Sequence, residues 1–99
     1  MSRRIRNERL DSRTGRLKLV PRSEPYWRSI QQGRAIGYRR LSRGKAGTWI
    51  ARDYDPMRTP ARLQKSLGNA DDLLDADGTG TFSFAQAQAS AFEWFTTLT

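Results

Sequence analysis

Three short segments in the middle of the chain alternate apolar and polar residues with the period of a β-strand. They cover residues 34–41, 47–54 and 61–68 and contain aromatic and β-branched side chains. The stretches SRGKAG and DPMRTP separate them, and their glycines and prolines are typical of turns. Connections this short do not allow a parallel crossover, so the pattern predicts a three-stranded antiparallel sheet at about residues 34–68.

The clearest helical pattern lies at the end of the chain, at about residues 83–98. Ser83 and Gln86 have the spacing of a capping box, S-x-x-Q. Apolar residues then recur on one helical face, namely Phe84, Ala87, Ala91, Trp94, Phe95 and Leu98. Because a sheet of three strands needs a cover, we expect this helix to pack on it and the fold class to be α+β. The chain ends at this helix without a capping glycine, so we expect a fragment of a longer protein.

The start of the chain is basic and has few apolar residues. Residues 1–10 are expected to form a flexible basic arm, and the rest of the chain, 11–99, a single domain. Asp11 or Ser12 would cap a possible short helix that stops before Pro21.

Charge is divided unevenly along the chain of 99 residues. Residues 1–65 hold all 18 Lys and Arg and five of the ten acids, a net charge of +13, whereas residues 66–99 hold the other five acids, a net charge of −5. This asymmetry indicates that the first two thirds of the chain bind a polyanion. Nucleic acid is the leading candidate and an anionic membrane surface the second; a merely solvated basic surface is the alternative.

The composition also excludes several classes of site. Without cysteine there can be no disulfide, thiolate zinc site or cysteine nucleophile, and without histidine the commonest general base and metal ligand is missing. No apolar run approaches the ~20 residues of a membrane-spanning helix, and the first residues lack the apolar core of a signal peptide. We therefore expect a soluble cytoplasmic protein, and the favoured nucleic-acid interpretation involves no cofactor, no small-molecule substrate and no membrane partner.

Strand alternation assigns the polar residues of the sheet to one face. The face covered by the helix would hold Ile36, Tyr38, Trp49, Ala51, Asp53, Leu63 and Leu67. The open face would hold Arg39, Thr48, Ile50, Arg52, Arg62, Gln64 and Ser66. Lys65 has the parity of the leucines, and we place it at an edge of the sheet.

The open face carries side chains that read base edges in a DNA major groove, which admits β structure. Arginine can bind guanine through two hydrogen bonds and glutamine can bind adenine in the same way, which makes Arg39, Arg52, Arg62 and Gln64 candidate base contacts. Phosphate contacts position a protein without specifying sequence, and Arg34, Arg40, Arg43 and Lys45 suit that role. The basic arm would follow the DNA backbone or a minor groove.

Two further stretches have competing interpretations. Tyr26 and Trp27 could stack on exposed bases, but closing the end of a small core is the favoured interpretation. The stretch DADGTGTFSFAQ resembles a calcium loop with Asp75 and Asp77 at its first and third positions. Its twelfth position is Gln86, which cannot bind calcium as a bidentate carboxylate, so an acidic loop leading into the helix is favoured and no metal site is predicted.

In chain order, the blocks PYW, GYRR, GTWIAR, LGNADD and SFAQAQASAFEWF resemble the N-terminal part of phage-type site-specific integrases, the tyrosine recombinases, in their proteobacterial subgroup. The likeness spans about residues 10–95. It implies an arm-type DNA-binding domain whose three-stranded antiparallel sheet, packed on a C-terminal helix, enters the major groove at accessory arm-type sites during DNA integration and recombination. Carried over by position, the DNA contacts are Arg39, Arg52, Arg62, Gln64 and Lys65.

The resemblance also bears on catalysis, partners and location. In such recombinases a separate C-terminal domain holds the tyrosine nucleophile and its Arg, Lys and His partners, and the three tyrosines here do not match the nucleophile's motif. We therefore expect a non-catalytic module of a phage or prophage protein, bound to duplex DNA at the bacterial nucleoid, with other integrase protomers as further candidate partners in a recombination complex. The alternative is a protein-interaction module that uses the C-terminal helix, including Phe92, and the acidic loop.

Overall fold

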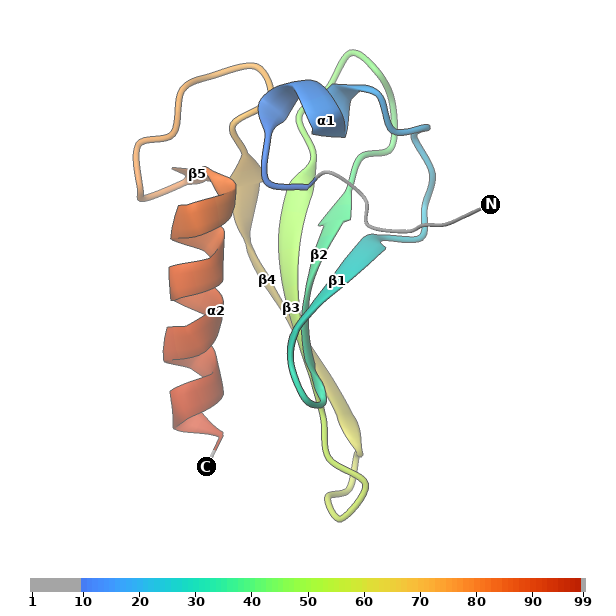
Figure 1. Ribbon diagram of the computed structural model, residues 1–99, viewed down its shortest axis with the longest axis vertical. Helices are drawn as coiled ribbons and strands as arrows, with labels where there is room; N and C mark the ends of the chain where they lie inside the picture. The colour runs from blue at the N-terminus through green and yellow to red at the C-terminus, as the bar shows by residue number, and fades with distance from the viewer. Residues whose placement is uncertain (1–9, 99) are drawn as a thin grey trace, which may run out of the picture.

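Five strands and two helices follow one another along residues 10–98, the part of the chain that this computed structural model describes (Figure 1). Their order is α1 (Arg13–Leu17), β1 (Tyr26–Gln31), β2 (Arg34–Arg39), β3 (Thr48–Tyr54), β4 (Arg62–Ala70), β5 (Thr81–Phe82) and α2 (Phe84–Thr97). The strands form one sheet in the order β1-β2-β3-β4-β5. The first three pairings are antiparallel, and β5 pairs with the end of β4 in parallel.

The α+β class is confirmed, but the prediction of three strands is wrong. The three predicted strands are β2, β3 and β4, paired antiparallel as expected. Two strands were missed. β1 pairs with β2 across a tight turn at Gln32 and Gly33, where Gly33 has a φ of 75° that favours glycine. β5 contains only two residues, too few for alternation to mark it.

Helix α2 starts at the predicted capping box. The Ser83 hydroxyl accepts a bond from the Gln86 backbone N–H at 3.2 Å, and the Gln86 side-chain oxygen accepts one from the Ser83 N–H at 3.0 Å. Three residues of the predicted apolar face, Ala87, Ala91 and Phe95, are fully buried. Two of these are alanines, whose small side chains allow the helix axis to lie close to the sheet.

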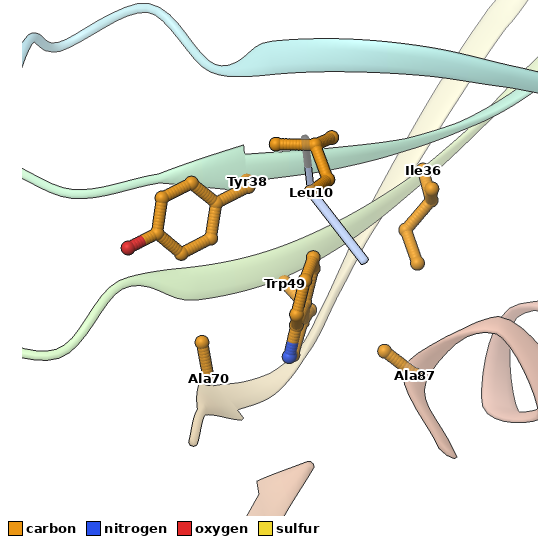
Figure 2. Close-up of a cluster of buried hydrophobic side chains, with 6 residues drawn as sticks. All are labelled: Leu10, Ile36, Tyr38, Trp49, Ala70 and Ala87. Atoms are coloured by element: carbon orange, nitrogen blue, oxygen red, sulfur yellow. The ribbon is translucent and has the colours of Figure 1, made fainter. Parts of the chain in front are cut away.

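The core lies between α2 and the face of the sheet that carries Ile36, Tyr38 and Trp49, as predicted (Figure 2). Trp49 is completely buried, and its indole N–H donates to the Phe82 carbonyl at 2.8 Å. The ring packs at a tilt on Tyr38, with 5.4 Å between centroids. Satisfying the indole N–H in this way removes the cost of burying it.

The predicted arm ends earlier than expected. Leu10 has no exposed surface and belongs to the core, so it is part of the domain and not of an arm (Figure 2). Ser12 caps α1 by accepting the Gly15 N–H at 3.0 Å, in agreement with the prediction. The rest of the arm, residues 1–9, lies outside the described residues, and so do its predicted contacts.

Helix α1 lies at one end of the sheet, next to the β2–β3 loop and the segment after β4 (Figure 1). A buried arginine attaches it there. Arg16 is 1% exposed and donates through Nε to Asp72 at 3.0 Å and through its terminal nitrogen to Asp71. It also donates to the Leu10 carbonyl at 2.9 Å and lies 5.0 Å from the centroid of the Trp49 ring. A buried charge needs such partners to offset its lost hydration.

Asp72 joins this cluster to the strands. It accepts the Tyr38 hydroxyl at 2.6 Å and the Gly47 backbone N–H at 2.7 Å. Burial and the hydrogen bond to Asp72 raise the pKa of Tyr38, which therefore stays protonated. Within residues 10–98, no helix is long and apolar enough to cross a membrane.

Candidate nucleic-acid interface

The sheet face opposite α2 presents four rows of residues set by strand register. Thr48 lies opposite Arg39, and Ile50 lies opposite Gly37 and Ser66. The next rows join Ala35, Arg52 and Gln64, then Tyr54 and Arg62. The predicted set of open-face residues is therefore confirmed, and the pairing with β3 defines the register of β4.

Trp27 lies flat on the middle of this face, above Gly37. A Cβ atom at position 37 would lie 2.6 Å from Cζ3 of Trp27, so only glycine leaves room for the ring. The two aromatic residues at the start of β1 thus divide between the faces of the sheet. Tyr26 packs against the core, as the favoured interpretation of this pair predicted. Trp27 does not, and it belongs to the open face.

The guanidinium of Arg52 stacks on Trp27, with 4.0 Å between Cζ and the ring centroid. Partial burial of Arg52, together with the nearby charge of Arg62, lowers its pKa from the ordinary value, but arginine keeps its charge at neutral pH. A hollow of about 540 Å³ opens beside the pair, and Ala35, Tyr54 and Arg62 are among its lining residues.

Pairing of acids with arginines leaves this face positively charged. Four aspartates, Asp53, Asp71, Asp72 and Asp75, form ion pairs with Arg13, Arg16, Arg34 and Arg58. All four arginines lie away from the open-face rows. No acidic side chain of residues 10–98 is within ion-pair distance of Arg39, Arg52 or Arg62. The face therefore offers cations to an anionic partner.

Arg34, predicted to contact phosphate, lies toward the core side of the sheet. Its Nε donates to Asp53 at 2.8 Å, and its guanidinium lies 4.8 Å from the centroid of the Phe95 ring on α2. Burial alone would raise the pKa of Asp53, but hydrogen bonds from Arg34 and Arg58 bring it below its ordinary value. These contacts give Arg34 a structural role, and we leave it out of the interface.

Arg40 is also occupied inside the domain. Its side chain is buried, with 4% exposed, and donates to the carbonyls of Leu17 and Leu19 at 3.4 and 3.1 Å. A guanidinium in this position holds the segment after α1 against the end of β2. Because it is not accessible to a phosphate, Arg40 is likewise left out of the interface.

The remaining predicted contacts are exposed but are not all on one face. Arg43 and Lys45 lie in the β2–β3 loop, beyond the end of the sheet that carries Arg39. Lys65 is paired in register with Ala51, which places it on the side of α2, at the part of β4 that no strand covers within residues 10–98. Arg39, Arg62 and Gln64 are exposed on the open face, with Arg52 partly buried between them.

In the acidic loop, the carboxylate of Asp77 is bonded to the backbone of the loop itself. Oδ1 of Asp77 accepts backbone N–H groups from Thr79, Gly80 and Thr81 at 2.8 to 3.1 Å. These bonds lower the pKa of Asp77 to about 2. The loop is therefore organised by its own backbone, which is the interpretation favoured over a calcium site. Among residues 10–98, no group of three or more His, Cys, Asp or Glu is arranged to hold a metal ion.

Comparisons of this chain with protein-family models, with curated proteins and with solved structures gave no match. The resemblance to site-specific integrases therefore stays a prediction that depends on the sequence blocks. The contacts to DNA also stay predictions.

Proposed function

We propose that the open face of the sheet binds duplex DNA in the major groove. The observation that carries this proposal is the division of charge. Aspartates neutralise four arginines that lie away from the open face, Arg13, Arg16, Arg34 and Arg58, whereas Arg39, Arg52 and Arg62 have no acidic partner within the described chain. Cations left unpaired together on one face bind a polyanion by releasing its counterions.

The spacing of the cations fits this proposal. Arg39 is opposite Thr48, and Arg52 follows four residues later on β3. At roughly 3.3 Å per residue, the two positions lie about 13 Å apart along the strand. A major groove is about 12 Å wide, so one sheet can bring both side chains to its edges and floor. Gln64, next to Arg52, adds a second group suited to a base edge.

We further propose that the chain is the N-terminal arm-binding module of a phage-type integrase. The ordered sequence blocks support this assignment, as does the packing of β2, β3 and β4 on a C-terminal helix. In this role the module would tether the recombinase to accessory sites on duplex DNA, while separate domains of the parent protein cut and rejoin strands.

A salt titration of binding to mixed-sequence duplex DNA tests the proposal. If about five phosphates are neutralised, log K should fall against log salt with a slope of roughly −4 to −5.

The double variant Arg39→Glu, Arg52→Glu should lose binding, because it replaces two attractive charges by repulsive ones. The matched control is Lys18→Glu, Arg22→Glu, which makes the same change of net charge at exposed positions outside the open face. Equal losses in both variants, or a flat salt response, would rule out this surface.

A protein-interaction module is the second candidate, and one observation favours it. Leu73 and Leu74, next to the acidic loop, are 56% and 71% exposed. They line a hollow of about 330 Å³ together with Ala46 and Ala70. Phe92 on α2 is partly buried against Phe95 and offers less surface. Sedimentation without DNA decides here, since a tight dimer that dissociates in the variant Leu73→Ser, Leu74→Ser would favour this function.

A further inference from the structure

The Trp27 ring is fixed from below. It rests on Gly37 of β2, where the absence of a side chain lets the indole lie against the strand. The ring does not belong to the core on the other side of the sheet. Closing the core therefore does not explain why an aromatic side chain lies flat on the open face. The charged group that packs on the ring suggests another role.

That group is the guanidinium of Arg52, the arginine of this face on the central strand. Stacking uses the flat face of the guanidinium and leaves its in-plane N–H donors available. No acceptor in residues 10–98 bonds to these donors. One neighbour across the sheet is Ala35, whose short side chain leaves space, and the other is Gln64. Arg52 therefore presents an oriented and unsatisfied pair of donors.

Two kinds of acceptor in DNA suit such donors, namely a phosphate and the O6/N7 edge of guanine. A flexible arginine serves a phosphate well, because a phosphate can be approached from many directions. Guanine requires a planar fork held in the plane of the base. Arg52 is held by stacking in the middle of the face, whereas Arg62 lies exposed at its border. The geometry favours guanine for Arg52 and phosphate for Arg62.

We propose that Arg52 reads one guanine of the bound duplex and that Trp27 is the positioning residue that orients its guanidinium. This inference rests on the proposed DNA binding and adds a base and a residue role to it. Orientation by the ring reduces the conformational freedom that Arg52 would otherwise lose on binding. Loss of the ring should then reduce discrimination between bases more than it reduces overall affinity.

The test selects bound sequences from a pool of random duplexes, then measures the affinity of the selected duplex and of versions changed at each guanine. For the wild type, one guanine should matter by roughly 10- to 100-fold. Arg52→Lys keeps the charge but loses the fork, so discrimination at this guanine should fall to about twofold while the salt slope is unchanged. Trp27→Leu should lose most of the discrimination, and Trp27→Phe, which retains a ring, should restore much of it. Arg22→Lys, at an exposed position outside the open face, is the control and should leave this guanine recognised.

The outcomes separate the two proposals. Undiminished guanine recognition by Arg52→Lys, or by a folded Trp27→Leu variant, would overturn the inference and leave DNA binding intact. So would an Arg52→Lys variant that weakens every duplex equally, since this is the behaviour of a phosphate contact. If no duplex binds the wild type in a salt-dependent manner, both proposals fail. If the thermal melt shows that Trp27→Leu does not fold, the discrimination at this guanine is compared between Trp27→Phe and Arg52→Lys, and this comparison still tests the inference.

Discussion

Two glycines control where aromatic rings lie on this sheet. Gly37 makes room for Trp27 on the open face, and Gly68 makes room for Phe82 at the end of β4. Gly68 also has a φ of 149°, in a region that side chains rarely adopt, at the point where the register of β3 and β4 shifts and Leu67 becomes an extra residue. Both positions therefore require glycine for reasons of space, and Gly68 also for its backbone.

We expect Gly68→Ala to lower the free energy of unfolding by about 1–3 kcal/mol. A Cβ atom there would lie 2.5 Å from the Phe82 ring, in addition to the unfavourable φ. Gly44→Ala is the control, because a Cβ at position 44 meets nothing within 4 Å. Urea unfolding of the two variants measures the difference. Equal stabilities would show that the ring moves aside without cost.

For single residues, the alternation along β2 already indicated the face on which two of the predicted phosphate contacts lie. Arg34 and Arg40 have the same parity as Ile36 and Tyr38, which places them on the covered face. Their expected role as phosphate contacts conflicted with that parity, and the structure gives them partners on the core side. No sequence pattern marks the stacking of Arg52 on Trp27, since it depends on how β1 pairs with β2.

Among the elements, the loop before α2 is organised by one carboxylate. Asp77 accepts three backbone N–H groups and turns the chain so that β5 and then the capping box of Ser83 and Gln86 follow. The loop and the helix start are thus built from local contacts. This explains why the helix was predicted well from sequence.

Asp77 should give the stability of the domain a defined pH dependence. Its pKa is lowered from 3.8 to about 2 on folding, so its contribution is fully present above the ordinary pKa and is lost as the pH falls towards the folded value. Asp77→Asn removes this titration. We expect the difference in unfolding free energy between wild type and variant to shrink as the pH falls from 3.8 to about 2. Unfolding in urea at a series of pH values checks this, and a difference independent of pH would contradict it.

The two strands that were not predicted from the sequence, β1 and β5, are recognisable only by their pairing with neighbouring strands. β1 has one core-facing aromatic, Tyr26, and one on the open face, Trp27, so its apolar residues do not mark a single side. β5 exists because the loop brings it beside the end of β4. By contrast, β2, β3 and α2 carry their own periodic patterns and were predicted to within one or two residues.

For the whole molecule, the cluster around Arg16 joins segments that are far apart in the chain. It connects α1 and Leu10 to Asp71 and Asp72 after β4, and through Asp72 to Tyr38. A single buried cation thus determines how the first residues of the domain meet the end of the sheet. Tertiary pairing of this kind could not be predicted from charge counts, which treat these groups as part of a solvated surface.

Arg16→Leu should therefore be strongly destabilising, by about 3–5 kcal/mol, because Asp72 would stay buried without its cation. Arg13→Ala is the comparison. Arg13 pairs with Asp75 at 3.2 Å and lies 3.8 Å from Asp71, but its side chain is 42% exposed and Asp75 is almost fully exposed, so this loss should be about 0–1 kcal/mol. Thermal or urea unfolding measures both. Similar effects of the two substitutions would mean that the buried cluster does not stabilise the fold.

The shifted register at Leu67 and Gly68 has a consequence for how copies of the domain behave when crowded. β4 pairs with β5 only at Asn69 and Ala70, so the outer rim of residues 62–68 has no neighbouring strand within the described chain. A bare rim invites another molecule to add its own strand and so to begin aggregation. The kink at Gly68 and the charge of Lys65 make that rim irregular and cationic, and both features oppose such self-association.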